Sequence, residues 1–219
     1  LGLSLATDFL VLYLFFELMS IPSYALVAFR RTDGMAVEAG MKYLVMSAVG
    51  SVVAFFGISL IYVQTWTLSF SGLLGTVQNT TVVQAALLFL IIGFGVKAAI
   101  VPLHTWLPDA HSAAPSGISA MLSGIVIAAG FFTLLRSLLV FTNIGLPIGQ
   151  ILIVLALLTM TVGNIMAFSQ LSREKIDLKR ILAYSSVAQM GYIILGIGVG
   201  VAYGIRAGYE GGLFHIMTH

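Results

Sequence analysis

Two ionisable residues, Lys97 and Glu17, lie in stretches of the sequence that are otherwise strongly apolar. Lys97 is the one charge within residues 87–101, and Pro102 follows that run directly. A charged side chain near the centre of a bilayer costs roughly 2.5–3.5 kcal/mol by insertion scales, so such residues usually face a polar interior or an ion path. Burial opposes the charged form of a lysine and of a carboxylic acid, which would let a proton pass between them. The two residues therefore predict a proton-transfer pair within a membrane.

Glu17 belongs to a polar stripe on one face of a predicted helix. Tyr13, Glu17, Ser20 and Tyr24 follow i, i+4, i+7 and i+11 spacing, which aligns them along that face. Glu17 would lie roughly 13 Å inside the helix at about 1.5 Å per residue, which is near mid-membrane. Tyr13 and Tyr24 are therefore expected to support the proton route. The structural alternative is a carboxylate that a basic partner holds in place.

Pro102 predicts a break in the helix that carries Lys97. Proline removes a backbone donor and clashes with the carbonyl four residues earlier, which disturbs hydrogen bonding around Ala98 and Ala99. Within a membrane, irregular backbone is tolerated only where protein or cavity water satisfies it, and transporters place ion sites at such breaks. The alternative is a simple proline kink with a lysine that extends toward the membrane interface.

Three histidine and aspartate positions near the break and two histidines near the C-terminal end are further candidates. His104, Asp109 and His111 match no common zinc spacing, so we expect them to support the proton path rather than to hold a metal. His215 and His219 share a helix face, but the sequence His-Ile-Met-Thr-His lacks the glutamate of the zinc-protease pattern. These two are expected to line the path, and a packing role for His215 stays open.

The composition indicates a membrane protein without a catalytic centre of its own. The 219 residues are 59% hydrophobic and 8% charged, whereas soluble domains have about 25% charged residues. The chain has no cysteine, which excludes disulfides, iron–sulfur ligation and thiolate metal sites. A formal charge of +2 is too small to suggest nucleic acid. We therefore expect lipid around the chain and no metal or cofactor within it.

About six complete spans and the start of a seventh are expected, because crossing about 30 Å of hydrocarbon takes about 20 apolar residues. The spans cover roughly residues 8–29, 37–63, 82–108, 115–141, 147–169 and 181–203, and the seventh begins near residue 211. The predicted fold is an all-α polytopic transmembrane bundle that forms a single domain over residues 1–219. The chain starts at Leu1 and stops within a newly started helix, so a fragment of a longer subunit is expected.

Positively charged loops predict the orientation of the chain, because Lys and Arg accumulate in short cytoplasmic loops. One group flanks the first turn and the other follows the fifth span: Arg30, Arg31 and Lys42, then Arg173, Lys175, Lys179 and Arg180. One crossing per span places both groups, and residues 106–109, at the cytoplasmic side. Lys179 is expected to serve this topology and to support the proton path.

A glycine repeat in the last spans predicts close helix packing. Gly196, Gly200, Gly204 and Gly208 recur at every fourth residue. Small residues at this spacing let two helix backbones approach within a membrane. The repeat would act as one packing face if the sixth span continued through all four glycines.

Four segments, in the same order along the chain, resemble the antiporter-like membrane subunits of the respiratory complex I family. They are residues 15–24 (FFELMSIPSY), 96–115 (VKAAIVPLHTWLPDAHSAAP), 177–186 (DLKRILAYSS) and 213–219 (LFHIMTH). Members of this family include subunits of NADH-quinone oxidoreductases, membrane-bound hydrogenases and multi-subunit sodium/proton antiporters. The resemblance covers essentially the whole chain and implies an internal fragment of a longer many-helix subunit.

The resemblance also implies roles for individual residues. Glu17 and Lys97 match the family's charged pair, which changes its charge state during pumping. His215 and His219 match histidines that connect the half-channels in some members. Two positions depart from the pattern: Ala128 stands where many relatives carry a lysine, and Leu122 stands where others carry a histidine. The departures leave open whether this region conducts protons.

Three functions are consistent with these features. The first is a proton-translocating subunit of a redox-driven, complex I-like pump in an energy-transducing membrane, such as a prokaryotic plasma membrane. Other membrane subunits would be its partners, and flavin, iron–sulfur and quinone chemistry would belong to partner subunits. The second is a subunit of a multi-subunit sodium/proton antiporter. The third is a membrane scaffold that does not conduct.

Overall fold

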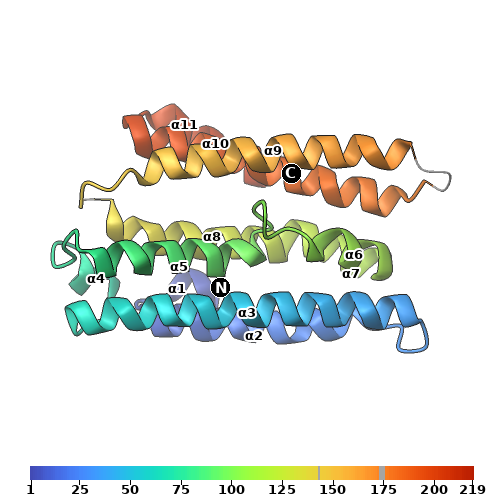
Figure 1. The fold of residues 1–219 in the computed structure, drawn as a ribbon, viewed down its shortest axis with the longest axis horizontal. Helices are drawn as coiled ribbons and strands as arrows, with labels where there is room; N and C mark the ends of the chain where they lie inside the picture. Colours follow the sequence, from blue (N-terminus) through green and yellow to red (C-terminus); the bar gives the residue numbers. More distant parts are fainter. Residues whose placement is uncertain (143, 173–175) are drawn as a thin grey trace.

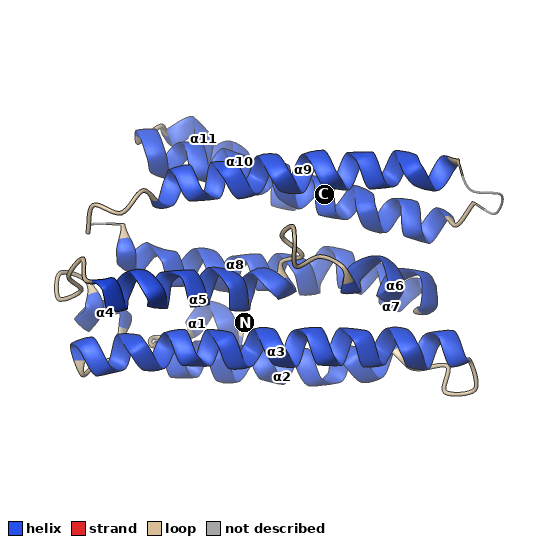
Figure 2. Cartoon of the chain, viewed as in Figure 1, coloured by secondary structure: helices blue, strands red, loops and turns tan. Residues whose placement is uncertain are grey.

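The computed structural model describes residues 1–142, 144–172 and 176–219 as a bundle of helices (Figure 1). Within these ranges every regular element is a helix, as Figure 2 shows. Five helices are long and apolar enough to cross a membrane: α2 (Phe9–Val27), α3 (Gly34–Thr65), the continuous helix Ser116–Phe141, α9 (Ile148–Leu171) and α10 (Leu178–Tyr203). These observations confirm the all-α polytopic class.

The third predicted span is a broken helix, and the break lies where Pro102 predicts it. The first half, α5 (Thr81–Lys97), ends at Lys97 itself, and the second half, α6 (Trp106–Ala113), follows after an irregular segment. In that segment Ala99 adopts a positive φ of 53°, which is uncommon for a residue other than glycine. In Figure 1, α5 and α6 lie roughly end to end and together run the length of the bundle once.

The described residues of the two positively charged loops lie at the same end of the bundle, as predicted. The turn between α2 and α3, with Arg30 and Arg31, lies at the same end of the bundle as α6 and the start of α10 (Figure 1). Lys179 and Arg180 belong to that start of α10, whereas Arg173 and Lys175 lie outside the described residues. The assignment of this end to the cytoplasm stays a prediction.

Side-chain caps define where several spans begin. The carboxylates of Asp8, Asp33 and Asp177 accept hydrogen bonds from the first turns of α2, α3 and α10. The hydroxyl of Thr80 accepts in the same way at the start of α5. An N-cap of this kind satisfies a backbone N–H that has no partner within the helix, and it typically stabilises the helix by about 1 kcal/mol. These helix starts are therefore specified by local sequence.

The glycine repeat packs two helices together, because the sixth span does not continue through all four glycines. α10 ends where Gly204 adopts a left-handed conformation with φ of 65°, a common way for a helix to stop. The chain then folds back as α11 (Arg206–Thr218), which begins before the predicted residue 211. Gly208 consequently faces Gly196 and Gly200 across the turn, and a Cβ on Gly208 would lie 2.8 Å from the Gly200 nitrogen.

The fourth span contains a π-helical segment that the sequence did not predict. It consists of α7 (Ser116–Met121), the π-helical residues Leu122–Ile127 and α8 (Ala128–Leu138), followed by one 3₁₀ turn. A π-helical turn changes the direction in which the following side chains point, and it is frequent at functional sites. Leu122 and Ala128, the two departures from the family pattern, thus lie at the start of this segment and just beyond it.

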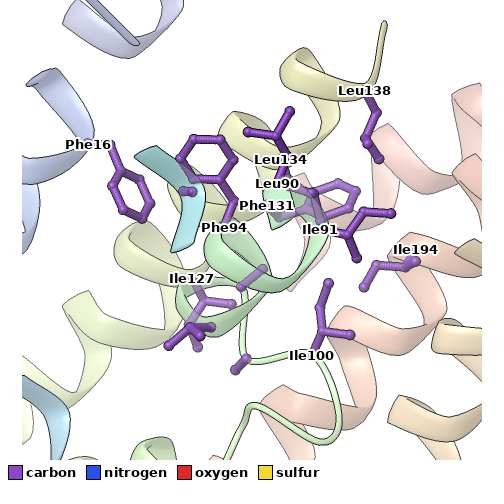
Figure 3. Packing of buried hydrophobic residues seen from close by; sticks show 14 of the residues in the cluster. Phe16, Leu90, Ile91, Phe94, Ile100, Ile127, Phe131, Leu134, Leu138 and Ile194 are labelled. Carbon is purple, nitrogen blue, oxygen red and sulfur yellow. The ribbon is translucent and has the colours of Figure 1, made fainter. Parts of the chain in front are cut away.

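The apolar core surrounds α5 and so encloses the helix that ends at Lys97. Figure 3 shows side chains of α5, α8 and α10 packed in one cluster, among them Leu90, Phe94, Phe131, Leu134 and Ile194. Phe16 of α2 joins this cluster, and its ring meets that of Phe94 edge-on at 5.1 Å between centroids. Because cores pack as densely as organic crystals, the end of α5 has little freedom to move sideways.

Arg136 of α8 fastens the N-terminal helix α1 (Gly2–Leu5) to the bundle. Its guanidinium donates to the carbonyls of Leu3 at 2.8 Å, Ser4 at 2.6 Å and Ala6. We expect Arg136→Met to lower the free energy of unfolding by about 2 kcal/mol, since these hydrogen bonds carry a charged donor. The apparent unfolding midpoint of the purified complex should fall by several degrees. Arg206→Ala is the control because the Arg206 side chain is 90% exposed, and an equal fall in that variant would contradict the assignment.

Candidate functional site

Lys97 occupies a buried position at the broken end of α5. Its side chain is 1% exposed, which makes it one of the largest fully buried side chains in the described chain. Gly130 of α8 packs directly against it, and a Cβ on this glycine would lie 2.9 Å from the Lys97 Cβ. The C-terminal end of a helix also carries partial negative charge, which favours a cation. The helix break therefore provides a site for the ammonium group in the core of the bundle.

Aromatic rings surround the Lys97 ammonium group. Its Nζ lies 4.4 Å from the centre of the Tyr43 ring and 4.6 Å from the centre of the Tyr24 ring. The two tyrosine rings meet edge-on at 4.8 Å, and the Trp106 ring stacks on Tyr43 at 4.0 Å with 12° between the planes. The indole N–H of Trp106 donates to the carbonyl of Val96 at 2.7 Å. Trp106, at the start of α6, thereby contacts the end of α5 across the break.

Two serine hydroxyls of α3 lie between Lys97 and Glu17. The Lys97 ammonium donates to the Ser47 hydroxyl at 3.4 Å, and the Ser51 hydroxyl, one helical turn further on, donates to the Glu17 carboxylate. In the described part of the chain, Lys97 and Glu17 do not form a direct ion pair. Each member of the predicted pair thus contacts its own hydroxyl of α3, and the two hydroxyls are four residues apart. Sequence reasoning missed Ser47 and Ser51, although their i, i+4 spacing within an apolar span was a visible signal.

The two tyrosines of the predicted stripe have different surroundings. Tyr24 is one of the rings around Lys97, as described above. Tyr13 is partly buried, lies one turn before Glu17 and packs against Phe55 at 5.2 Å between ring centres. The Ser20 hydroxyl is buried and donates to the carbonyl of Phe16 within its own helix. The structure therefore brings Tyr24 to Lys97, whereas Tyr13 packs against Phe55.

His104 and Asp109 lie on either side of the start of α6. His104 belongs to the break and is 8% exposed, and its Nδ1 has no hydrogen-bond partner among the described residues. The Asp109 carboxylate forms ion pairs with Lys42 of α3, at 3.1 Å, and with Arg180 of α10. Asp109 therefore ties three helices together at the end of the bundle that carries the positive loops.

A second polar cluster surrounds a cavity of about 530 Å³. His111 of α6 is 3% exposed, and its Nδ1 lies 2.7 Å from the Ser119 hydroxyl. The Lys179 ammonium donates to the carbonyl of Ala114 at 2.8 Å, where α6 ends. The cavity is lined by His111, Ser116, Ser119, Ala120, Ser123, Lys179, Leu182, Ser185, Ser186, Gln189 and His219. Such a polar cavity is roomy enough to hold several water molecules.

The two C-terminal histidines join this cluster from α11. The His215 Nε2 lies 2.6 Å from the Gln189 side-chain oxygen, so this nitrogen is the donor. The His219 Nε2 lies 3.4 Å from the Ser123 hydroxyl, which is itself 2.8 Å from the Ser186 hydroxyl. Ser123 belongs to the π-helical segment. A hydroxyl thus contacts His219 one residue after Leu122, the position that lacks a titratable side chain here.

The predicted site residues therefore form two groups. Glu17, Tyr24 and Lys97 gather near the helix break. His111, Lys179 and His219 line the cavity, and His215 contacts its lining residue Gln189. Each group contains hydroxyls that the sequence analysis did not single out. Both groups offer what proton transfer requires, namely ionisable side chains with hydroxyl or cavity contacts between them.

The family model and the similar relatives point to the same family. Residues 6–219 match the family described as NADH:quinone oxidoreductase/Mrp antiporter, transmembrane region. NADH-quinone oxidoreductase subunit N of Desulfitobacterium hafniense is 40% identical over 98% of the chain, and that of Herminiimonas arsenicoxydans is 36% identical over 98%. The chain spans 46% and 44% of these relatives, which is about half of their length.

Three solved structures have the same fold. The archaeal membrane-bound sulfane sulfur reductase matches all of the chain and 44% of its own subunit, with a TM-score of 0.88 and 36% identity. A subunit of the Mrp complex of Dietzia aligns with all of the chain over 40% of its own length, with a TM-score of 0.85 and 27% identity. A subunit of respiratory complex I of Thermus thermophilus aligns with 99% of the chain over 45% of its own length, with a TM-score of 0.77 and 29% identity. The chain is an integral membrane protein and belongs to the NADH:quinone oxidoreductase/Mrp antiporter family.

Proposed function

We propose that this chain is part of a proton-translocating subunit of a redox-driven membrane complex. The observation that supports this most strongly is the buried Lys97 at the helix break, with hydroxyls leading toward Glu17. Burying an ionisable group within a membrane costs free energy, so a residue in this position is by default a candidate for function. Relatives that are subunits of NADH-quinone oxidoreductases add support.

Lys97 holds the transferred proton in this mechanism. A charged Glu17 stabilises the ammonium form through space, because opposite charges attract strongly where little water is present. When Glu17 becomes protonated, that stabilisation is lost and Lys97 releases its proton. Ser47 and Ser51 lie between the two groups and can each donate and accept a hydrogen bond. His215 and His219, with Ser123 and the cavity, continue the route away from the break.

Electron transfer would take place in other subunits of the complex. The relatives are named as subunits of larger enzymes, and the chain itself offers no cysteine for an iron–sulfur cluster. Flavin, iron–sulfur clusters and quinone are accordingly assigned to partner subunits. Neighbouring membrane subunits would cover part of the bundle surface.

A sodium/proton antiporter subunit is the second candidate. The similarity to the Mrp complex, with a TM-score of 0.85 over the whole chain, favours it specifically. Among the described residues, Glu17 is the one carboxylate in the two clusters, the first around Lys97 and the second around the cavity. Sodium prefers oxygen ligands that include carboxylates, as hard cations do. The lining residues therefore support protons over sodium at these sites.

Vesicles that contain the full-length protein in its complex distinguish these functions. We expect the wild-type complex to acidify one side of the vesicle when the redox substrate is added in sodium-free buffer. A sodium pulse without redox substrate should leave the internal pH unchanged. Sodium-dependent pH changes in the absence of electron transfer would support the antiporter instead. A scaffold role would be indicated if pumping stayed the same after Lys97→Ala.

A further inference from the structure

We infer that Tyr43 and Trp106 are positioning residues that hold the Lys97 ammonium group in its charged form and tie the two halves of the broken helix around it. This inference rests on the proposed function and adds to it. It concerns how a buried cation is stabilised when its carboxylate partner is not in contact. The three aromatic residues Tyr24, Tyr43 and Trp106 are called the aromatic cage below.

The aromatic cage supplies negative potential in direct contact with the ammonium group, where no carboxylate of the described chain is in contact. The face of an aromatic ring carries partial negative charge and attracts a cation within about 6 Å, more strongly when water is excluded. The Lys97 Nζ lies well within that range of both Tyr43 and Tyr24, and Tyr43 is fully buried. The remaining polar contact of the ammonium group in the described structure is the 3.4 Å bond to Ser47. The rings are therefore a principal stabilising contact of the charge.

Hydrogen bonds at both ends hold the stacked pair of rings in place. The Tyr43 hydroxyl lies 2.9 Å from the Ser23 hydroxyl, which fixes the ring between α2 and α3. The Trp106 N–H is bonded to the carbonyl of Val96, the residue before Lys97. Trp106 is 1% exposed, so this bond is shielded from solvent. The cage consequently joins α6 to the end of α5 at the position where the proton is held.

The elements around Lys97 present few other groups that respond to pH. Toward Lys97, α2 presents Tyr24 and, through Ser51, Glu17; α3 presents Tyr43 and Ser47; α6 presents Trp106; and α8 presents Gly130. His104 lies in the break itself. A change confined to the face of the Tyr43 ring therefore acts on Lys97 without adding or removing a charge. This separates the role of the cage from the role of Glu17.

Graded fluorination of the ring at position 43 tests the inference in the full-length complex. Phenylalanine and its mono-, di- and trifluorinated forms are introduced at position 43 by genetic code expansion, with phenylalanine as the reference of the series. Each fluorine withdraws electron density from the ring face and weakens the attraction to a cation, while ring size changes little. We expect the pH of half-maximal pumping to move to lower values in steps that follow the number of fluorines.

The same series at Phe141 is the matched control. Phe141 is fully buried in the apolar core, and none of the cation–ring contacts among the described residues involves it. This series should leave the pH profile in place. Suppose that the pH of half-maximal pumping does not shift across the series at position 43, while Lys97→Ala still abolishes pumping. This result would overturn the cage inference alone. Unchanged pumping in Lys97→Ala would overturn the proposed function itself.

Discussion

Replacing Lys97 by alanine is expected to reduce proton pumping per transferred electron by at least about 100-fold, the lower end of what a positioned proton-transfer group contributes. The side chain is buried at the helix break, and no other ammonium group of the described chain contacts the hydroxyls that lead to Glu17. The measurement is the number of protons translocated per electron in sealed vesicles. Electron transfer is measured in the same vesicles with an uncoupler, so that loss of coupling is distinguished from loss of the enzyme.

Lys97→Arg separates the charge of this side chain from its ability to release a proton. Arginine stays protonated at all accessible pH values, so it keeps the charge and cannot pass the proton on. We expect pumping in this variant to be as low as in Lys97→Ala. Arg206→Ala removes an exposed cation at the surface and should pump normally. Normal pumping by Lys97→Arg would mean that the position needs only a positive charge.

The double variant Ser47→Ala with Ser51→Ala is expected to lower the pumping rate by roughly 10-fold or more. Both serines are buried, and one contacts the Lys97 ammonium group while the other contacts the Glu17 carboxylate. Their removal leaves two ionisable groups without a hydrogen-bond partner, which costs about 1–3 kcal/mol for each group. Each single variant should have a smaller effect. The rate is measured in vesicles under the same conditions as for Lys97→Ala.

Ser59→Ala is the matched control for the serine pair. Ser59 lies on the same helix, and its hydroxyl donates to the carbonyl of Phe55 within α3 rather than to another helix. We expect this variant to pump like the wild type. Equal losses in the Ser59 variant and in the double variant would show that the effect arises from α3 itself and not from the two hydroxyls.

Several features of the fold and site could be predicted because they follow from local chemistry. Proline cannot continue a helix, so Pro102 located the break, and α5 indeed ends at Lys97. The polar stripe of the first span placed Tyr24 on the face that meets Lys97. The cost of burying a charge indicated that Lys97 needs a polar interior. Each of these inferences uses residues that are neighbours within one helix.

The rest of the site depends on contacts between helices, which the sequence alone does not specify. Tyr43 and Trp106 are ordinary aromatic residues in an apolar sequence, and their roles arise only when α3 and α6 meet at the break. The glycine repeat looked like one face because its spacing is regular, but the left-handed Gly204 divides it between two helices. The π-helical turn before Ala128 contacts α10 through Ser123 and Ser186, and no proline in the segment indicates it from the sequence.

The central claim is that Glu17 and Lys97 change their protonation states as one coupled unit. Redox-triggered infrared difference spectroscopy of the full complex tests it most directly, because a carboxyl group that gains a proton shows a distinct stretching band. We expect such a band during turnover, absent in Glu17→Gln, shifted in Ser51→Ala and lost in Lys97→Ala. A Glu17 band that stays unchanged in Lys97→Ala would show that the two groups act independently and would contradict the coupled pair.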